Sequence, residues 1–100
     1  MNYKVTDDEL AALKLSLRIE QDDTLDDGLL RDCLKSAKAY VQNAVDEEVD
    51  LTKYQQYTWA TMMLAQFYYN NRGSVDMKRT PYQVLSMIQQ LRGLSYSKDE

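Results

Sequence analysis

The chain has 100 residues, enough for one small domain, and its 44% of hydrophobic residues is ordinary for a globular protein. No apolar run approaches the roughly 18 residues that span a membrane, the N-terminal segment lacks the apolar stretch of a signal peptide, and the single cysteine excludes an internal disulfide, so we expect a protein made in the cytosol. The net charge is −4, and the absence of histidine removes the side chain most often used for proton transfer at neutral pH.

A first helix is predicted over about residues 7–18. Thr6 and Glu9 fit a capping box, in which each side chain accepts a hydrogen bond from the backbone N–H of the other residue. Val5 and Leu10 lie where a hydrophobic staple would join them, and the acidic first turn suits the positive end of the helix dipole. The apolar face expected to enter the core consists of Leu10, Leu13 and Leu17.

Two aspartate pairs, at residues 22–23 and 26–27, follow this helix and raise the question of a metal site. An EF-hand with Gly28 at its glycine position would place leucine at two of the four ligand positions tested, so the calcium pattern fails. With no histidine and one cysteine, an ordinary transition-metal cluster is not available either. The sequence therefore predicts no metal site and no cofactor.

The carboxylates are better explained as the start of a second helix, predicted over about residues 25–45. Thr24 or one of the first aspartate pair is expected to cap it, with Asp26 and Asp27 in its first turn. Asp27 lies four residues before Arg31, the favourable orientation for an ion pair along a helix. The predicted apolar face contains Leu30, Cys33, Leu34, Ala37, Tyr40, Val41 and Ala44.

A third helix, over about residues 54–71, is apolar on nearly all sides. One face carries Tyr57, Ala60, Leu64, Phe67 and Tyr68, and much of the rest is covered by Trp59, Met62, Met63, Ala65 and Tyr69. Such a helix is either the central helix of a monomer or buries a second face against a neighbouring subunit. Because tyrosine, tryptophan and methionine are enriched at protein interfaces, we favour some contribution from a partner surface.

A fourth helix is predicted over about residues 81–92, with Thr80 as its N-cap and a proline at its first position. Its apolar face consists of Val84, Leu85, Ile88 and Leu91. Arg92 suits the negative end of this helix, and Gly93 is expected to stop it. The sequence thus predicts an all-α fold, a small four-helix bundle that forms a single domain over residues 1–100.

Charge is distributed unequally along the chain. Residues 1–50 hold 13 of the 16 acidic and 6 of the 12 basic side chains, so this half carries −7 and the other half +3. Opposite charges in the two halves are consistent with self-association or with two different partners, and equally with uneven scatter over a solvated surface. The loop after the third helix carries Arg72, Lys78 and Arg79, which could contact phosphate or an acidic partner.

These features argue against catalysis and against sequence-specific DNA binding. The acidic residues cluster at helix starts and in a connector, no serine lies in a nucleophile-elbow pattern, and Cys33 has no histidine to activate it. A DNA-reading helix would need several basic residues, whereas the fourth helix contains only Arg92. The alternatives to a structural protein are a small helical DNA-binding or regulatory protein and an enzyme that uses paired carboxylates.

The order and spacing of four motifs resemble the phage head–tail connector family, the group that includes the connector of HK97-type siphophages. The positions that carry the resemblance are Leu17-Arg18-Ile19, then Leu29-Leu30, Leu34, Ala37, Tyr40 and Val41, then Tyr69-Asn70-Asn71-Arg72, and finally Pro81, Val84, Leu85, Ile88, Leu91 and Arg92. The resemblance covers about residues 8–93. It departs from the family pattern at Gly73, where an acidic residue would be expected.

The resemblance implies a non-enzymatic, all-helical subunit that forms a ring beneath the phage portal protein. Such a ring would close the head after DNA packaging, let DNA pass through its channel without reading its sequence, and offer a docking surface to a downstream tail-completion protein. It implies a place in the virion at the head–tail junction, after assembly in the bacterial cytoplasm, and no contact with a membrane. The residues expected at the subunit or portal contact are Tyr68, Tyr69, Asn70, Asn71, Arg72, Lys78 and Arg79.

Overall fold

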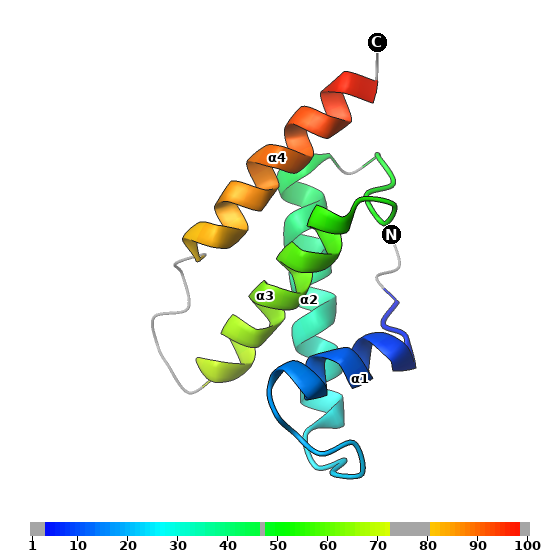
Figure 1. Cartoon of the computed structure of the whole chain (residues 1–100), viewed down its shortest axis with the longest axis vertical. Coiled ribbons are helices and arrows are strands. Elements are labelled where there is room, and N and C mark those ends of the chain that lie inside the picture. The colour runs from blue at the N-terminus through cyan, green and yellow to red at the C-terminus, as the bar shows by residue number, and fades with distance from the viewer. Residues whose placement is uncertain (1–3, 47, 73–80, 99–100) are drawn as a thin grey trace.

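The computed structural model describes residues 4–46, 48–72 and 81–98, and the fold is all-α, as predicted (Figure 1). Four helices follow one another along the chain: α1 (Asp7–Ser16), α2 (Asp27–Val45), α3 (Gln55–Asn70) and α4 (Tyr82–Lys98). The molecule extends over 46, 29 and 22 Å along its three principal axes. The predicted N-cap of the last helix, Thr80, lies outside the described residues.

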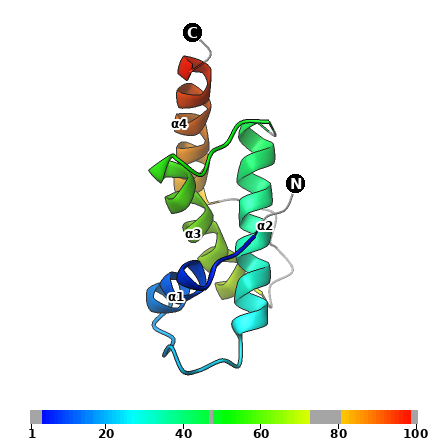
Figure 2. The ribbon, with the colours of Figure 1, turned by 90° about the vertical axis from the view of Figure 1, so that its right-hand side faces the viewer.

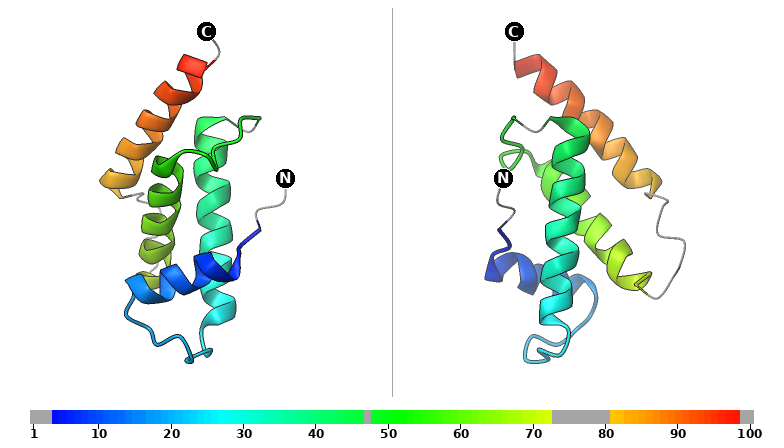
Figure 3. Two further views of the ribbon diagram at one scale, coloured as in Figure 1. Left: turned by 45° about the vertical axis from the view of Figure 1, so that its right-hand side comes forward. Right: turned by 180° about the vertical axis from the view of Figure 1, so that it is seen from behind.

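Helix α3 lies among the other helices and contacts all three of them (Figure 2). Helix α2 runs beside α3, α4 packs against α3 and α2, and α1 crosses α2 near the N-terminal end of α2 (Figure 3). Helices α2 and α3 thus both contact the three other helices, and this arrangement is consistent with the central position that was one of the two interpretations of the most apolar segment. The contact with a neighbouring subunit that the same segment suggested stays a prediction.

The core is built mainly from the apolar faces that the sequence predicted. Its buried members include Leu10, Leu13, Leu30, Cys33, Leu34, Ala37, Val41, Leu51, Tyr57, Ala60, Leu64, Ala65, Val84, Ile88 and Leu91. Tyr40 and Leu85 were expected in the core but lie exposed on the outer sides of α2 and α4. Leu51 was missed because it lies alone in the acidic connection between α2 and α3, where no helical periodicity marks it.

Helix α1 begins at the predicted capping box. The Glu9 N–H donates to Thr6 Oγ1 over 3.1 Å, and the Thr6 N–H donates to Glu9 Oε1 over 2.9 Å. The helix ends at Ser16, two residues before the predicted end, because Arg18 adopts a left-handed backbone with φ = 61°. The Ile19 N–H then donates to the Lys14 carbonyl and the Arg18 N–H to the Leu15 carbonyl, which is the hydrogen-bond pattern of a Schellman motif.

Helix α2 begins at Asp27, two residues later than predicted, with Asp26 as its N-cap residue. The expected cap is wrong: the N-cap residue is Asp26, which was expected in the first turn, in place of Thr24 or the aspartates at residues 22–23, and Asp26 makes no side-chain cap hydrogen bond. Asp23 instead accepts a hydrogen bond from the Leu25 N–H over 3.2 Å and so shapes the turn before the helix. Short polar side chains often hydrogen-bond to the backbone two residues onward, and here this local bond replaces the cap.

Helix α4 continues through Gly93 to Lys98, so the predicted stop at Gly93 is wrong. Glycine ends a helix when it adopts a left-handed conformation, and Gly93 keeps helical backbone instead. Arg92 does not serve the end of its own helix either. Its Nε and one terminal nitrogen donate to the Ala44 carbonyl of α2 over 2.9 and 2.7 Å, so Arg92 satisfies a carbonyl in the last turn of α2.

The left-handed conformation of Arg18 yields a stability prediction. Because glycine adopts this conformation without a Cβ clash, Arg18→Gly should stabilise the fold by about 0.5–1 kcal/mol in urea unfolding. The control is Ala12→Gly in the exposed interior of α1, which should destabilise by about 1 kcal/mol. A loss of stability in Arg18→Gly would contradict the interpretation of this helix end.

Candidate functional site

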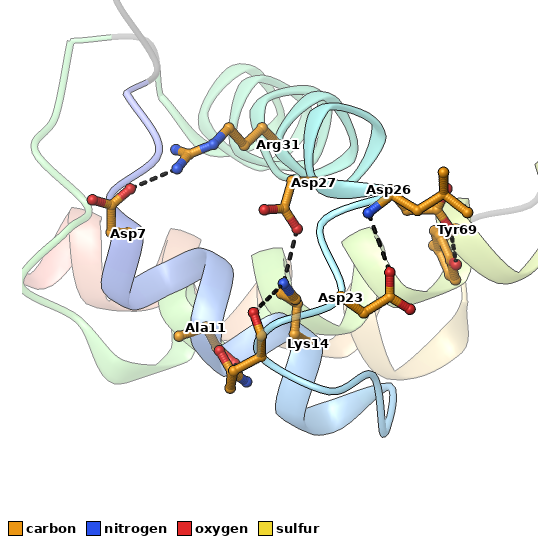
Figure 4. Close-up of polar contacts among 10 residues, drawn as sticks. Asp7, Ala11, Lys14, Asp23, Asp26, Asp27, Arg31 and Tyr69 are labelled. Atoms are coloured by element: carbon orange, nitrogen blue, oxygen red, sulfur yellow. Dashed lines mark hydrogen bonds and ion pairs between the residues drawn. The ribbon is translucent and has the colours of Figure 1, made fainter.

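Lys14 is the most deeply buried charged residue among those described, with 2% of its surface exposed. Its ammonium donates to Asp27 Oδ1 and to the Gln21 carbonyl, each over 2.9 Å (Figure 4). Burial of a charge is costly unless the charge is paired and hydrogen-bonded, and both conditions hold here. The predicted ion pair between Asp27 and Arg31 is wrong, because Asp27 turns toward Lys14.

Two further ion pairs join α1 to α2. Lys38 of α2 pairs with Glu9 over 2.6 Å and also donates to the Lys4 carbonyl over 2.8 Å. Arg31 pairs with Asp7 over 2.6 Å (Figure 4). Arg31 also donates to the Val5 carbonyl over 3.1 Å. The Lys38 pair is mostly shielded from solvent and the Arg31 pair is open to it, so the Arg31 pair contributes less to stability.

The acidic stretch that raised the question of a metal site therefore has a structural role. Asp27 pairs with Lys14, Asp23 shapes the turn, and Asp26 accepts a hydrogen bond from the Tyr69 hydroxyl over 2.5 Å. That bond to the carboxylate raises the pKa of the Tyr69 hydroxyl. In the part of the chain that the structure describes, no three acidic, cysteine or histidine side chains are grouped so as to hold a metal ion.

The C-terminal end of α3 carries five of the predicted contact residues. The Arg72 guanidinium lies over the Tyr69 ring, 4.1 Å from its centroid, and donates to the Tyr69 carbonyl. Asn71 donates from its side chain to the Phe67 carbonyl, and Asn70 is exposed. The hydrogen bond from Tyr69 to Asp26 therefore places Arg72 beside the start of α2. Two further predicted contact residues, Lys78 and Arg79, lie outside the described residues.

An apolar groove of about 330 Å³ lies between α2 and the end of α3. It is lined by Leu29, Asp32, Cys33, Ser36, Tyr68 and Arg72. Burial, with a smaller effect from the charge of Asp32, raises the pKa of the Cys33 thiol above its ordinary value, which disfavours the nucleophilic thiolate. Burial also raises the pKa of Tyr68. The groove thus offers apolar contact surface without a reactive group.

A second groove of about 520 Å³ lies on the other side of Asp32 along α2. This basic groove is lined by Lys4, Val5, Gly28, Arg31, Asp32 and Lys35. Three of its six residues are cations and one is an anion; because Arg31 is paired with Asp7, the positive charge of the groove comes from Lys4 and Lys35. The outer face of α2 therefore has an apolar groove on one side and a basic groove on the other.

The described residues form an all-α domain with two surface grooves and three ion pairs that join α1 to α2. A comparison with known families matches residues 7–92 to the family described as Phage gp6-like head-tail connector protein, and the chain belongs to this family. The match runs from the first residue of α1 into α4. Connectors of this family are structural phage proteins and not enzymes. No curated protein and no solved structure matches the chain.

Within the described ranges, no helix combines the length and the apolar character needed to cross a membrane.

The sequence did not lead us to expect buried lysines, although two lysines lie at positions that belong to the apolar faces of their helices. Lys14 lies between Leu13 and Leu17 on the apolar face of α1, and Lys38 lies beside Ala37 on the apolar face of α2. A lysine at such a position is either buried and paired or ends the apolar face. The identity of each partner carboxylate depends on how the helices cross, which periodicity does not contain.

Removal of the Asp27 carboxylate should be strongly destabilising. Asp27→Ala leaves the Lys14 ammonium buried with one carbonyl as its acceptor, so we expect a loss of about 3 kcal/mol in urea unfolding. The double variant Lys14→Met/Asp27→Ala should lose less than Asp27→Ala alone, because no unpaired charge remains. A double variant that is less stable than Asp27→Ala would contradict this account.

The stability of the α1–α2 junction should also depend on pH. Partial burial acts to raise the pKa of Glu9, but the hydrogen bond and charge of Lys38 and the bonds to Thr6 outweigh it, so the pKa of Glu9 is lowered below 4.5. The stabilisation is therefore complete above the unfolded pKa and is lost as the pH falls through the lower folded value. Between pH 5 and 3, Glu9→Gln should lose stability less steeply than the parent chain, as measured by urea unfolding at each pH. Glu20→Gln, which removes an exposed carboxylate, is the control for net charge, and equal slopes in the parent and Glu9→Gln would contradict the prediction.

Proposed function

We propose that this head–tail connector assembles as a ring of identical subunits beneath the portal protein at the vertex of the phage head. The ring would close the filled head, let DNA pass through its channel, and present a surface to the tail-completion protein. Its place would be in the virion at the head–tail junction. The observation that carries the proposal is the family match over residues 7–92, which includes α1, α2, α3 and the first part of α4.

The contact surfaces support this proposal. Ring subunits need apolar area that the isolated fold leaves uncovered, and half of the surface of Trp59 is exposed on the central helix. Tyr68 and Arg72 line the apolar groove at the end of α3, and aromatic residues and arginine are the types enriched at protein interfaces. The composition of this groove supports the proposal that the end of α3 makes subunit or portal contacts.

The test of assembly is the molar mass of the protein, measured by light scattering after size-exclusion chromatography over a range of concentrations. The measurement is made with the protein alone and after addition of the portal protein of the same phage. A large discrete oligomer, or a subunit that joins the portal ring, would support the proposal. A dimer that ignores the portal and binds duplex DNA in a salt-dependent manner would contradict it.

Arg72 gives the corresponding variant. Arg72→Glu reverses the charge at the rim of the groove, and we expect subunit or portal association to weaken by about tenfold or more while helicity by circular dichroism is unchanged. Lys53→Glu, in the connection between α2 and α3, is the control with the same change in net charge. Normal assembly by Arg72→Glu would show that this end of α3 is not a contact.

A further inference from the structure

Leu25 lies almost fully in solvent, with 88% of its surface exposed, in the loop between α1 and α2 and two residues before α2 begins. The loop is held by its own hydrogen bonds, from the Asp23 N–H to the Glu20 carbonyl and from the Leu25 N–H to Asp23 Oδ1. Gln21 ties it to α1, since its side chain donates to the Ala11 carbonyl over 3.1 Å. The fold therefore displays Leu25 in a fixed position, which lowers the entropy cost of using it in a contact.

The loop that carries Leu25 is strongly acidic. Glu20, Asp22 and Asp23 are all exposed in the residues before this leucine. Asp26 and Asp27 are partly buried and are engaged by Tyr69 and Lys14. We call residues 20–25 the acidic loop, and it fits a partner surface that has an apolar recess with cations beside it.

The outer face of α2 combines an apolar recess with neighbouring cations, which is the surface that the acidic loop would fit. The apolar groove provides the recess, and Leu29 and Tyr40 expose further apolar surface on the same helix. Lys35 lies in the adjoining basic groove, and Arg72 lies at the rim of the apolar groove. Asp32, between the two grooves, is the acidic member of the face.

We propose that the acidic loop of one copy docks on the outer face of α2 of a second copy. Leu25 enters the apolar groove, and the carboxylates of the loop lie against Lys35 and Arg72. The inference rests on the proposed ring and identifies the surfaces that join its neighbouring subunits. Charge complementarity carries the choice of a second copy, because the loop exposes the carboxylates of Glu20, Asp22 and Asp23, while Lys35 and Arg72 outnumber Asp32 on the face of α2.

A subunit cannot satisfy this contact by itself. Hydrogen bonds from Lys14 and to Ala11 hold the acidic loop against α1, and Leu25 stays exposed there. The contact therefore joins two different surfaces on two copies, and we place the copies head to tail because the proposed ring requires it, whereas a reciprocal exchange between two copies would stop at a dimer. A head-to-tail contact closes into a ring when the rotation between neighbours permits it, whereas a symmetric contact of one surface with itself stops at a dimer.

The first test is Leu25→Asp, compared with the control Leu15→Asp at another exposed leucine, 74% exposed, in α1. Both residues lie outside the core, so circular dichroism and urea unfolding should match the parent chain. Molar mass is measured with the protein alone and on portal rings. We expect Leu25→Asp to lose subunit–subunit association by at least tenfold and Leu15→Asp to retain it.

The second test uses a variant that blocks the groove. Ser36 is exposed and lines the apolar groove, so Ser36→Trp should fill the groove without disturbing the core. Each variant alone should remain monomeric. A mixture of Leu25→Asp with Ser36→Trp should give dimers of one copy of each and nothing larger, because each copy keeps one intact surface.

The outcomes separate this inference from the proposed function. If the parent chain and Leu25→Asp assemble equally, the docking inference is overturned, and the subunits of the ring contact one another through other surfaces. If the two variants fail to form a mixed dimer although the parent chain assembles, the inference is overturned as well. If the parent chain forms no oligomer either alone or on portal rings, both the proposed ring and this contact are wrong.

Discussion

The burial of Lys14 is the constraint on which the arrangement of the first half of the molecule depends. An ammonium with almost no exposed surface requires an anion, and Asp27 at the first turn of α2 supplies it. The same ammonium binds the Gln21 carbonyl, so one charge fixes both α1 and the loop that follows it. The direction in which the acidic loop projects is thus set by an ion pair, while α2, α3 and α4 are joined mainly through apolar faces.

The helices could be predicted because their signals are local. The capping box at Thr6 and Glu9 and the apolar faces of α2 and α4 each depend on residues within a few turns of one another. The errors arose where a distant segment decides the outcome. Arg92 donates hydrogen bonds to a carbonyl at the end of α2 and not to the end of its own helix. Asp27 forms its ion pair with Lys14 of α1 and not with Arg31, four residues along its own helix. Periodicity contains no information about how helices cross.

The contact region that the chemistry of Tyr68 and Arg72 suggested stays a prediction, and both residues line one groove of the structure. The sequence could not show that α2 provides most of the lining of that groove, because Leu29, Cys33 and Ser36 come from a segment about 40 residues away. It also could not show that Leu25 is exposed, since the exposure of a leucine just before a helix depends on how the loop is placed against α1. A leucine in a loop and a leucine in a core face look alike without the tertiary fold.

The bond from Arg92 to Ala44 has a consequence for the way the sequence can vary. Its acceptor is a backbone carbonyl, which every amino acid provides, so the side chain at position 44 is restricted only by space beside the core. Position 92 requires a long side chain with a fork of donors, and lysine would lose one of the two bonds. Lys38 and Arg31 also bind carbonyls of the segment before α1. As phage sequences diverge, substitutions should therefore accumulate at the positions whose carbonyls accept these bonds. The arginine and lysine residues that donate the bonds should change less often.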